Sequence, residues 1–279
     1  MGNFTLAKQD FLLFGPAILL LAVLCYWPLA WVALQALTVK GELSFTTIAT
    51  VATGQIFWVS TLNTIYLTTS VVLITALVGY PLAYLVSQAS PLWSYTLKFL
   101  ILFPFWTSTL VRTYAWVVIL QRDGLLVNAM RMVVPDMTPV SFLNTRAAST
   151  IGMVHIMLPF FVFPLLASME SIKRDYLRAA ESLGAKPIIA FWTVFFPLSL
   201  PGLLSSVIMV LMLSIGFYII PIVLGGGKGA VISMVIEKSL SLYPDWAVAS
   251  SMGLLLLLMS AVALTILNAL ANKAQSIWR

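Results

Sequence analysis

Few side chains in this sequence are suited to acid–base, nucleophilic or metal chemistry. His155 is the only histidine and Cys25 the only cysteine, and no Cys, Asp or Glu lies within a turn of His155. A metal site needs several such ligands close together. The run Gly225–Gly229 does not match a phosphate-binding GxxxxGK followed by Ser or Thr. We therefore expect no catalytic residue, no metal site and no ATP or Mg bound by this chain itself.

Two ionisable side chains stand within apolar sequence and allow two interpretations each. Arg112 at mid-bilayer would cost about 2.5 to 3.5 kcal/mol on insertion scales, so it must be paired, hydrated or directed outward. It is either a structural anchor for helix-end carbonyls or a wall of a solute path. His155 either hydrogen-bonds a neighbouring backbone group or hydroxyl, or relays protons.

The composition identifies the class of protein that must position these residues. The chain has 279 residues, of which 61% are hydrophobic and 9% charged, and its mean hydropathy is +1.03. About 25% of the residues in soluble proteins are charged, so a soluble enzyme is excluded. Long segments carry no Lys, Arg, Asp or Glu at all: 11–39, 43–97, 147–169, 187–227 and 246–272.

These segments are long enough to cross a bilayer as helices, which needs about 20 apolar residues. Uninterrupted apolar runs and the lack of period-two alternation exclude a membrane β-barrel. The first run is longer than a signal-peptide core. We predict an all-α integral membrane protein, with residues 1–279 forming one domain. Its six predicted spans are Phe11–Leu37, Thr61–Ser87, Lys98–Leu120, Ala148–Met169, Pro201–Leu224 and Ala247–Ala271.

The distribution of Lys and Arg predicts the orientation. Four basic residues lie between 173 and 186, in the loop that joins the fourth and fifth spans. Loops rich in Lys and Arg stay in the cytoplasm, so we place this loop and both termini on that side. The net charge of +6 comes from short loops rather than from one continuous patch. Nucleic acid is therefore not an expected partner, whereas membrane lipid is.

The same loop has the signals of a helix, a tight turn and a second helix. Asp175 is a candidate N-cap, Gly184 a candidate C′ residue and Pro187 a first helical residue. The first helix would have about nine residues and span about 13 Å, which is marginal alone in water. Its Tyr176, Ala179, Ala180 and Leu183 share one slim face. Either this face enters a groove on a partner, or the loop lies on the membrane surface without one.

Several motifs resemble those of a known family. Ala179-Ala180, Gly184-Ala185, Phe196-Pro197-Leu198 and Pro201-Gly202 resemble the cytoplasmic coupling motif of permease subunits of ATP-binding-cassette (ABC) importers. Further segments resemble the spermidine/putrescine permeases in particular, over nearly the whole chain from about residue 60. These segments are Thr61–Thr64, Gly79–Ala83, Phe105–Ser108, Val111–Trp116, Gly152–Pro159, Gly216–Tyr218 and Leu224–Gly226.

The resemblance implies a six-helix type I importer permease whose residues 175–197 form a cytoplasmic coupling loop. It implies an inner-membrane complex with a second permease, two ATPase subunits that bind ATP and Mg, and an extracytoplasmic solute-binding protein. The coupling residues would be Asp175, Tyr176, Arg178, Ala179, Ala180, Glu181, Leu183, Gly184, Ala185 and Pro197. The candidate solute path comprises Trp106, Leu110, Arg112, Tyr114, Phe217 and Tyr218.

This chain departs from the family in two places. The family usually has an acidic residue before the paired alanines, where this chain has Arg178, with Glu181 following. Many relatives also carry an acidic residue near Phe217, which this chain lacks. A polyamine would then meet aromatic faces rather than carboxylates. Two alternatives remain: an importer of an anionic or zwitterionic solute such as an opine or phosphonate, and a secondary transporter that works without a motor.

Overall fold

The computed structural model describes residues 8–39, 42–134, 141–227, 229–242 and 244–277. In these ranges five helices are long and apolar enough to cross a membrane. They lie within α1 (Lys8–Leu37), α3 (Gln55–Gln88), α7 (Arg146–Glu170), the continuous helix Pro187–Gly216, and α13 (Trp246–Ile277). The helical membrane fold is thus confirmed. The count of six crossings remains a prediction.

The chain divides into two compact units. The first comprises residues 1–57 and 236–257. It holds α1, a short antiparallel pair of strands, α2 (Thr46–Thr53) and the first part of α13. Strands β1 (Thr38–Val39) and β2 (Glu42–Leu43) pair with Thr38 opposite Leu43. The described side chains of α1 are mostly exposed, so within this unit α1 has an apolar surface with little covering it.

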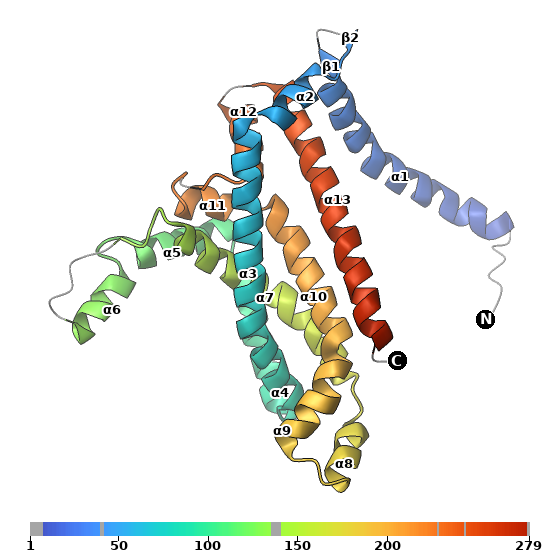
Figure 1. Ribbon diagram of the computed structural model, residues 1–279, viewed down its shortest axis with the longest axis vertical. Coiled ribbons are helices and arrows are strands. Elements are labelled where there is room, and N and C mark those ends of the chain that lie inside the picture. Colours follow the sequence, from blue (N-terminus) through green and yellow to red (C-terminus); the bar gives the residue numbers. More distant parts are fainter. Residues whose placement is uncertain (1–7, 40–41, 135–140, 228, 243, 278–279) are drawn as a thin grey trace. The chain divides into compact units, whose positions relative to one another are not determined.

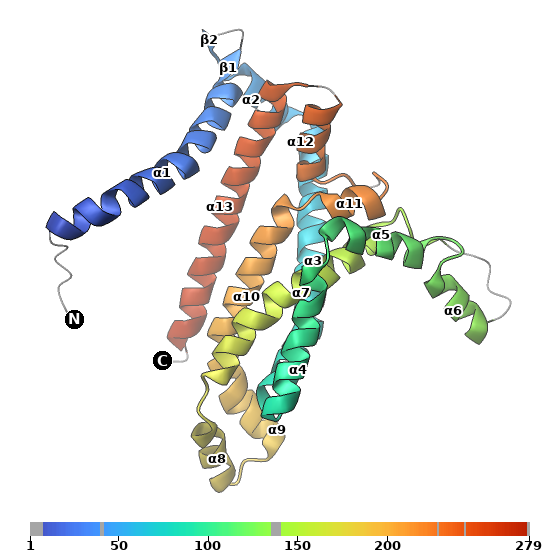
Figure 2. The same ribbon diagram turned by 180° about the vertical axis from the view of Figure 1, so that it is seen from behind.

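The second unit, residues 58–235 and 258–279, is built around α7 and α10 (Phe196–Gly216). These helices lie side by side in both ribbon views (Figure 1, Figure 2). They approach so closely that a Cβ on Gly202 would collide with Ser168. A Cβ on Gly79 of α3 would likewise lie 2.5 Å from the ring of Phe161. Small residues let the backbones of membrane helices approach in this way.

The predicted third span, Lys98–Leu120, is not one helix, which corrects the sequence analysis. The structure has α4 (Pro91–Leu102), a 3₁₀ turn η1 (Phe103–Trp106) and α5 (Thr109–Leu120). Thr107 and Ser108 are extended and separate the two helices. Pro104 has no N–H to donate, and its carbonyl instead accepts both the N–H and the hydroxyl of Thr107. This local bonding ends the first helix.

The predicted fifth span, Pro201–Leu224, is also wrong at both ends. Its helix begins at Pro187 and runs through α9 (Pro187–Ala190), a π-helical turn η2 (Phe191–Phe195) and α10. It stops at Gly216 because Phe217 is extended, and α11 (Ile219–Leu224) follows as a separate short helix. Residues Ile232–Ser241 form α12, which the sequence did not predict.

The long loop Gln121–Ala147 contains α6 (Leu125–Val133) and returns across two helix ends. The backbone N–H groups of Phe142 and Leu143 donate to the carbonyl of Leu120, and that of Asn144 donates to the carbonyl of Leu224. These bonds satisfy carbonyls at the ends of α5 and α11 that have no partner within their own helices. The loop thereby links the two short helices.

Candidate functional site

The helix of the predicted coupling loop is α8 (Arg174–Ser182), nine residues long as expected. It packs on α9 and η2, at the end of the α7–α10 pair (Figure 1). Its N-cap is Lys173, which makes no side-chain cap bond, so the prediction of Asp175 as N-cap is wrong. Asp175 lies in the first turn, where its negative charge interacts favourably with the positive end of the helix dipole. Its carboxylate is 3.8 Å from the guanidinium of Arg178.

The turn after α8 forms as predicted around Gly184. This residue has a φ of +87°, in the left-handed region that glycine adopts without strain. Its N–H donates to the carbonyl of Glu181 at 2.9 Å, and the N–H of Ala185 donates to the carbonyl of Ala180 at 3.0 Å. This pair of bonds is the Schellman motif. Pro187 then starts the next helix with Lys186 as its N-cap, also as predicted.

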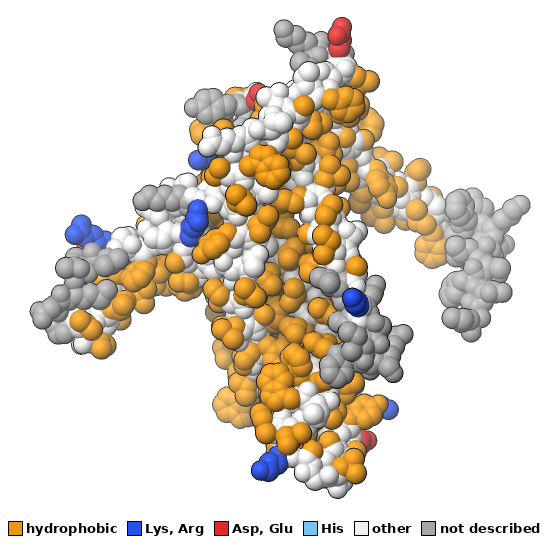
Figure 3. Space-filling view, viewed as in Figure 1, with side chains coloured by type: hydrophobic (Ala, Val, Ile, Leu, Met, Phe, Trp, Pro, Cys, Tyr) orange, Lys and Arg blue, Asp and Glu red, His pale blue; other side chains and the backbone are white. Residues whose placement is uncertain are grey.

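Among the residues predicted to share a face, Tyr176 and Ala179 of α8 are exposed, as is Leu183, which follows the helix. Leu183 is 90% exposed and Tyr176 52% exposed, whereas Ala180 is half-buried. The inner face carries Leu177, which packs against the buried core. Three of the four residues predicted to share a face therefore point outward, and Ala180 turns partly inward. Figure 3 shows charged side chains at the end of the molecule that carries α8, while the visible surface of α3 and α10 is largely apolar.

The remaining coupling residues do not all lie on this surface. Arg178 and Glu181 are exposed on α8, and Ala185 is half-buried in the turn. Pro197 is half-buried inside the long helix, thirteen positions after Gly184 in the sequence. The structure thus places Pro197 in a membrane helix rather than on the surface hairpin.

The candidate path residues divide into separate groups. Leu110 and Tyr114 lie on the exposed side of α5, and Trp106 is exposed in η1 with its ring 5.7 Å from that of Phe99. Arg112 faces another way and is half-buried. Phe217 and Tyr218 sit at the break between α10 and α11, where the carbonyl of Phe217 accepts a hydrogen bond from Ser233.

Arg112 and His155 belong to one cluster between α5 and α7. His155 accepts a hydrogen bond at its Nδ1 from the indole N–H of Trp116 at 3.3 Å, so a neighbouring helix does hold it, through an indole rather than a backbone group or hydroxyl. Arg112 makes one long bond, 3.4 Å from its guanidinium to the hydroxyl of Thr109. Its Nε is buried and has no hydrogen-bond partner among the described residues.

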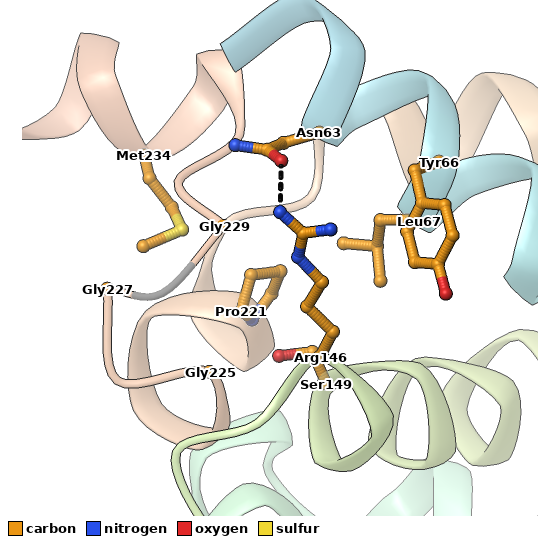
Figure 4. A pocket seen from close by; sticks show the side chains of 10 residues that line it. All are labelled: Asn63, Tyr66, Leu67, Arg146, Ser149, Pro221, Gly225, Gly227, Gly229 and Met234. Carbon is orange, nitrogen blue, oxygen red and sulfur yellow. Dashed lines mark hydrogen bonds between the residues drawn. The ribbon is translucent and has the colours of Figure 1, made fainter. Parts of the chain in front are cut away.

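A second polar cluster was not identified from the sequence. Figure 4 shows Arg146, at the start of α7, reaching between α3 and the loop Gly225–Gly229. Its guanidinium donates to Asn63 Oδ1 at 2.9 Å and lies 5.4 Å from the ring centre of Tyr66. Asn63 in turn donates to the carbonyl of Ala230. A Cβ on Gly229 would lie 3.0 Å from Arg146, so the glycine loop fits closely around this arginine.

No group of three or more His, Cys, Asp or Glu side chains that could hold a metal ion occurs within the described residues. The most distinct exposed feature of the described residues is the short helix and glycine turn joined to the long membrane helices.

Comparisons with known proteins give the family. Residues 77–276 match the family of binding-protein-dependent transport system inner membrane components. The spermidine/putrescine transport system permease protein PotB of Haemophilus influenzae is 32% identical over 218 residues, which cover 78% of this chain and 72% of PotB. A protein of Salmonella typhi named "Putative 2-aminoethylphosphonate transport system permease protein PhnU" is 27% identical over 249 residues, 87% of this chain and 85% of PhnU.

The fold has a counterpart among solved structures. A chain of a bacterial alginate ABC transporter, in complex with an alginate pentasaccharide-bound periplasmic protein, superposes with a TM-score of 0.77 at 16% sequence identity and 96% coverage of both chains. This likeness concerns the fold alone. Together with the family match over most of its length, it leads to one identification: the chain belongs to the inner membrane components of binding-protein-dependent transport systems, as a multi-pass permease subunit and not an ATPase.

Proposed function

We propose that this permease imports a polyamine, spermidine or putrescine, and that α8 and its glycine turn dock on the ATPase subunit that drives it. The observation that carries the docking is the geometry of the hairpin. A nine-residue helix is too short to be stable alone in water, and here it is held by packing on its inner face. On its outer face, Tyr176 is 52% exposed and Leu183 is 90% exposed among the described residues.

Charge supports a cytoplasmic position for this hairpin. Four basic residues lie in or beside it: Lys173, Arg174, Arg178 and Lys186. Loops rich in Lys and Arg are retained in the cytoplasm. Both chain ends then also lie in the cytoplasm if the chain crosses the membrane six times. ATP and Mg are held by the partner ATPase in this proposal, and a second permease subunit completes the solute path. An extracytoplasmic binding protein delivers the solute.

The polyamine assignment rests on the relatives rather than on a site in this chain. The PotB proteins of Haemophilus influenzae and Escherichia coli match at 32% and 30% identity. Exposed rings on η1 and α5, such as Trp106 and Tyr114, are suitable for cation–π contacts with ammonium groups at about 0.5 to 2 kcal/mol each. Arg112 would act as a structural residue in this case. Carboxylates for the cation would come from the partner permease or the binding protein.

Arg112 also favours a second candidate, an importer of a zwitterionic phosphonate. Its buried Nε–H has no hydrogen-bond partner among the described residues, and guanidinium groups bind phosphate-like anions well. The phosphonate-named relative covers more of this chain than the Haemophilus PotB does. A fixed cation beside the path would repel a polyamine and attract such an anion.

The solute can be determined with the cognate binding protein and the reconstituted complex. We expect spermidine or putrescine to raise the melting temperature of the binding protein and to stimulate ATP hydrolysis by the complex, while 2-aminoethylphosphonate and opines do neither. Arg112→Gln should leave polyamine import within about twofold, because the arginine is not part of the polyamine site in this proposal. Stimulation by 2-aminoethylphosphonate alone, lost in Arg112→Gln, would establish the second candidate instead.

A further inference from the structure

An aromatic cluster lies between the coupling hairpin and α3. It consists of Phe191, Phe195 and Phe196 of the long helix and Tyr80 and Tyr84 of α3. The ring of Tyr84 is 5.1 Å from both Phe191 and Phe195, in edge-to-face geometry at 79° and 78°. Phe195 is buried, and Phe191 and Tyr84 are half-buried. We call these five side chains the aromatic cluster.

The hairpin rests directly on this cluster. Helix α8 packs on η2, the turn that carries Phe191 and Phe195. Leu177, on the inner face of α8, and Phe191 both pack against the same buried core. A displacement of α8 would therefore act on η2 before it acts on α10.

The backbone of η2 is unusual at this point. Residues Phe191–Phe195 are π-helical, a conformation that is rare and occurs mostly as single turns inside α-helices, often at functional sites. Pro197 follows and cannot donate a backbone hydrogen bond, which removes the α-helical partner of the carbonyl of Thr193. The hydroxyl of Thr193 donates to the carbonyl of Ile189 at 2.7 Å. In this turn the N–H of Phe196 donates to the carbonyl of Phe191, five residues earlier rather than the four of an α-helix.

A second contact ties α3 to α10 just beyond the turn. The hydroxyl of Tyr80 lies 2.8 Å from that of Ser199, which itself donates to the carbonyl of Phe196. Tyr80 and Tyr84 are one helical turn apart, so both face the long helix. Edge-to-face ring pairs have a preferred geometry, and a densely packed interior passes on displacement rather than absorbing it.

We infer that Phe191 and Tyr84 are positioning residues that transmit movement of the coupling hairpin to α3, with the π-helical turn η2 as the joint. The inference rests on the proposed docking of α8 on an ATPase subunit. It adds to that proposal a defined route from the hairpin into one membrane helix. Loss of the ring contact should uncouple ATP hydrolysis from solute without detaching the ATPase.

The test uses the complete complex in lipid nanodiscs, with both permeases, the ATPase subunits and the binding protein loaded with spermidine. The variants are Phe191→Leu, Tyr84→Leu and the double variant, and the matched control is Tyr84→Phe, which keeps the ring. We expect each leucine variant to lower spermidine-stimulated ATP hydrolysis by about two- to tenfold, the range of one aromatic pair. The loss in the double variant should be smaller than the two single losses combined, because both substitutions remove the contact between Tyr84 and Phe191.

Two further readouts separate transmission from a merely structural role. Basal ATP hydrolysis and the amount of ATPase that copurifies should stay unchanged, so that the ratio of stimulated to basal activity falls. An unchanged ratio in both leucine variants would overturn the inference, as would a parallel loss of basal activity and bound ATPase. Because the two substitutions lie on different helices, one serves if the other fails to assemble. A wild-type complex that lacks bound ATPase would instead refute the proposed docking itself.

Discussion

The exposed leucine at the end of α8 allows a quantitative test of docking. Leu183 is 90% exposed, so Leu183→Ala removes almost no contact within the chain and should change the free energy of unfolding by no more than about 0.5 kcal/mol. If the ATPase subunit covers this side chain, the variant loses the burial of three carbon groups at about 0.8 kcal/mol each. The loss is about 2.4 kcal/mol, which corresponds to about 50-fold weaker binding.

In the assay, the membrane complex is titrated with purified ATPase subunit, and the fraction of ATPase subunit bound is measured. Leu43→Ala is the matched control, because Leu43 is 77% exposed in β2, outside the hairpin. The control should bind like the wild type. Leu177→Ala provides the opposite comparison: that side chain packs against the core, so its loss should lower the melting temperature of the permease. Equal affinity of Leu183→Ala and the wild type would show that this face does not contact the ATPase.

Two glycines give further predictions. At Gly184 the left-handed backbone costs a non-glycine residue roughly 1 to 2 kcal/mol, so Gly184→Ala should weaken coupled ATP hydrolysis, and Gly184→Asn should weaken it less. Gly184→Pro can neither adopt this φ nor donate a hydrogen bond to the carbonyl of Glu181. This variant should therefore insert into the membrane but lose coupling. Normal coupling in Gly184→Pro would contradict the role of the turn. Gly202→Ala should lower the melting temperature, at a cost of about 1 to 3 kcal/mol, because its Cβ would collide with Ser168, whereas Gly253→Ala, with open space around it, should not.

The hairpin could be predicted because its signals are local. A glycine at a left-handed position and a proline at a first helical position each reflect a requirement of a single residue's backbone, and Gly184 and Pro187 meet those requirements. The start of α8 was misplaced because a polar residue near a helix start can serve either as a cap or in the first turn. Asp175 takes the second place, and Lys173 caps without a side-chain bond.

The breaks in the membrane helices were missed because hydropathy does not report them. Residues 99–121 are almost uncharged whether the chain is one helix or two, and at the break the carbonyl of Pro104 accepts both the N–H and the hydroxyl of Thr107. The π-helical turn was missed for the same reason, since nothing in the largely apolar composition of Phe191–Phe195 distinguishes this turn from an α-helix. The charge pattern did identify the membrane segments, because charge is what the bilayer excludes.

The Arg146 cluster shows a third kind of limit. Arg146 and Asn63 are 83 positions apart in the sequence, and their contact exists only because α3, α7 and the loop Gly225–Gly229 meet in space. In the glycine run, Gly226 and Gly227 have positive φ, which is typical of a turn. What the turn encloses could not be predicted, since a single sequence contains no record of which distant residues lie together.

The close approach of α7 and α10 constrains how the hairpin can act. The chain leaves α7 at Glu170, passes through α8 and enters the helix that becomes α10. Because Gly202 lies so close to Ser168 that a Cβ would collide, we expect the two helices to move together if α8 is displaced. Relative motion would then arise where helices are interrupted, at η2, at the extended residues Thr107 and Ser108, and at Phe217. Two of these interruptions carry candidate path residues. Phe217 and Tyr218 lie at the end of α10, and Trp106 lies next to Thr107. Movement of the hairpin and opening of a path would therefore involve the same interruptions.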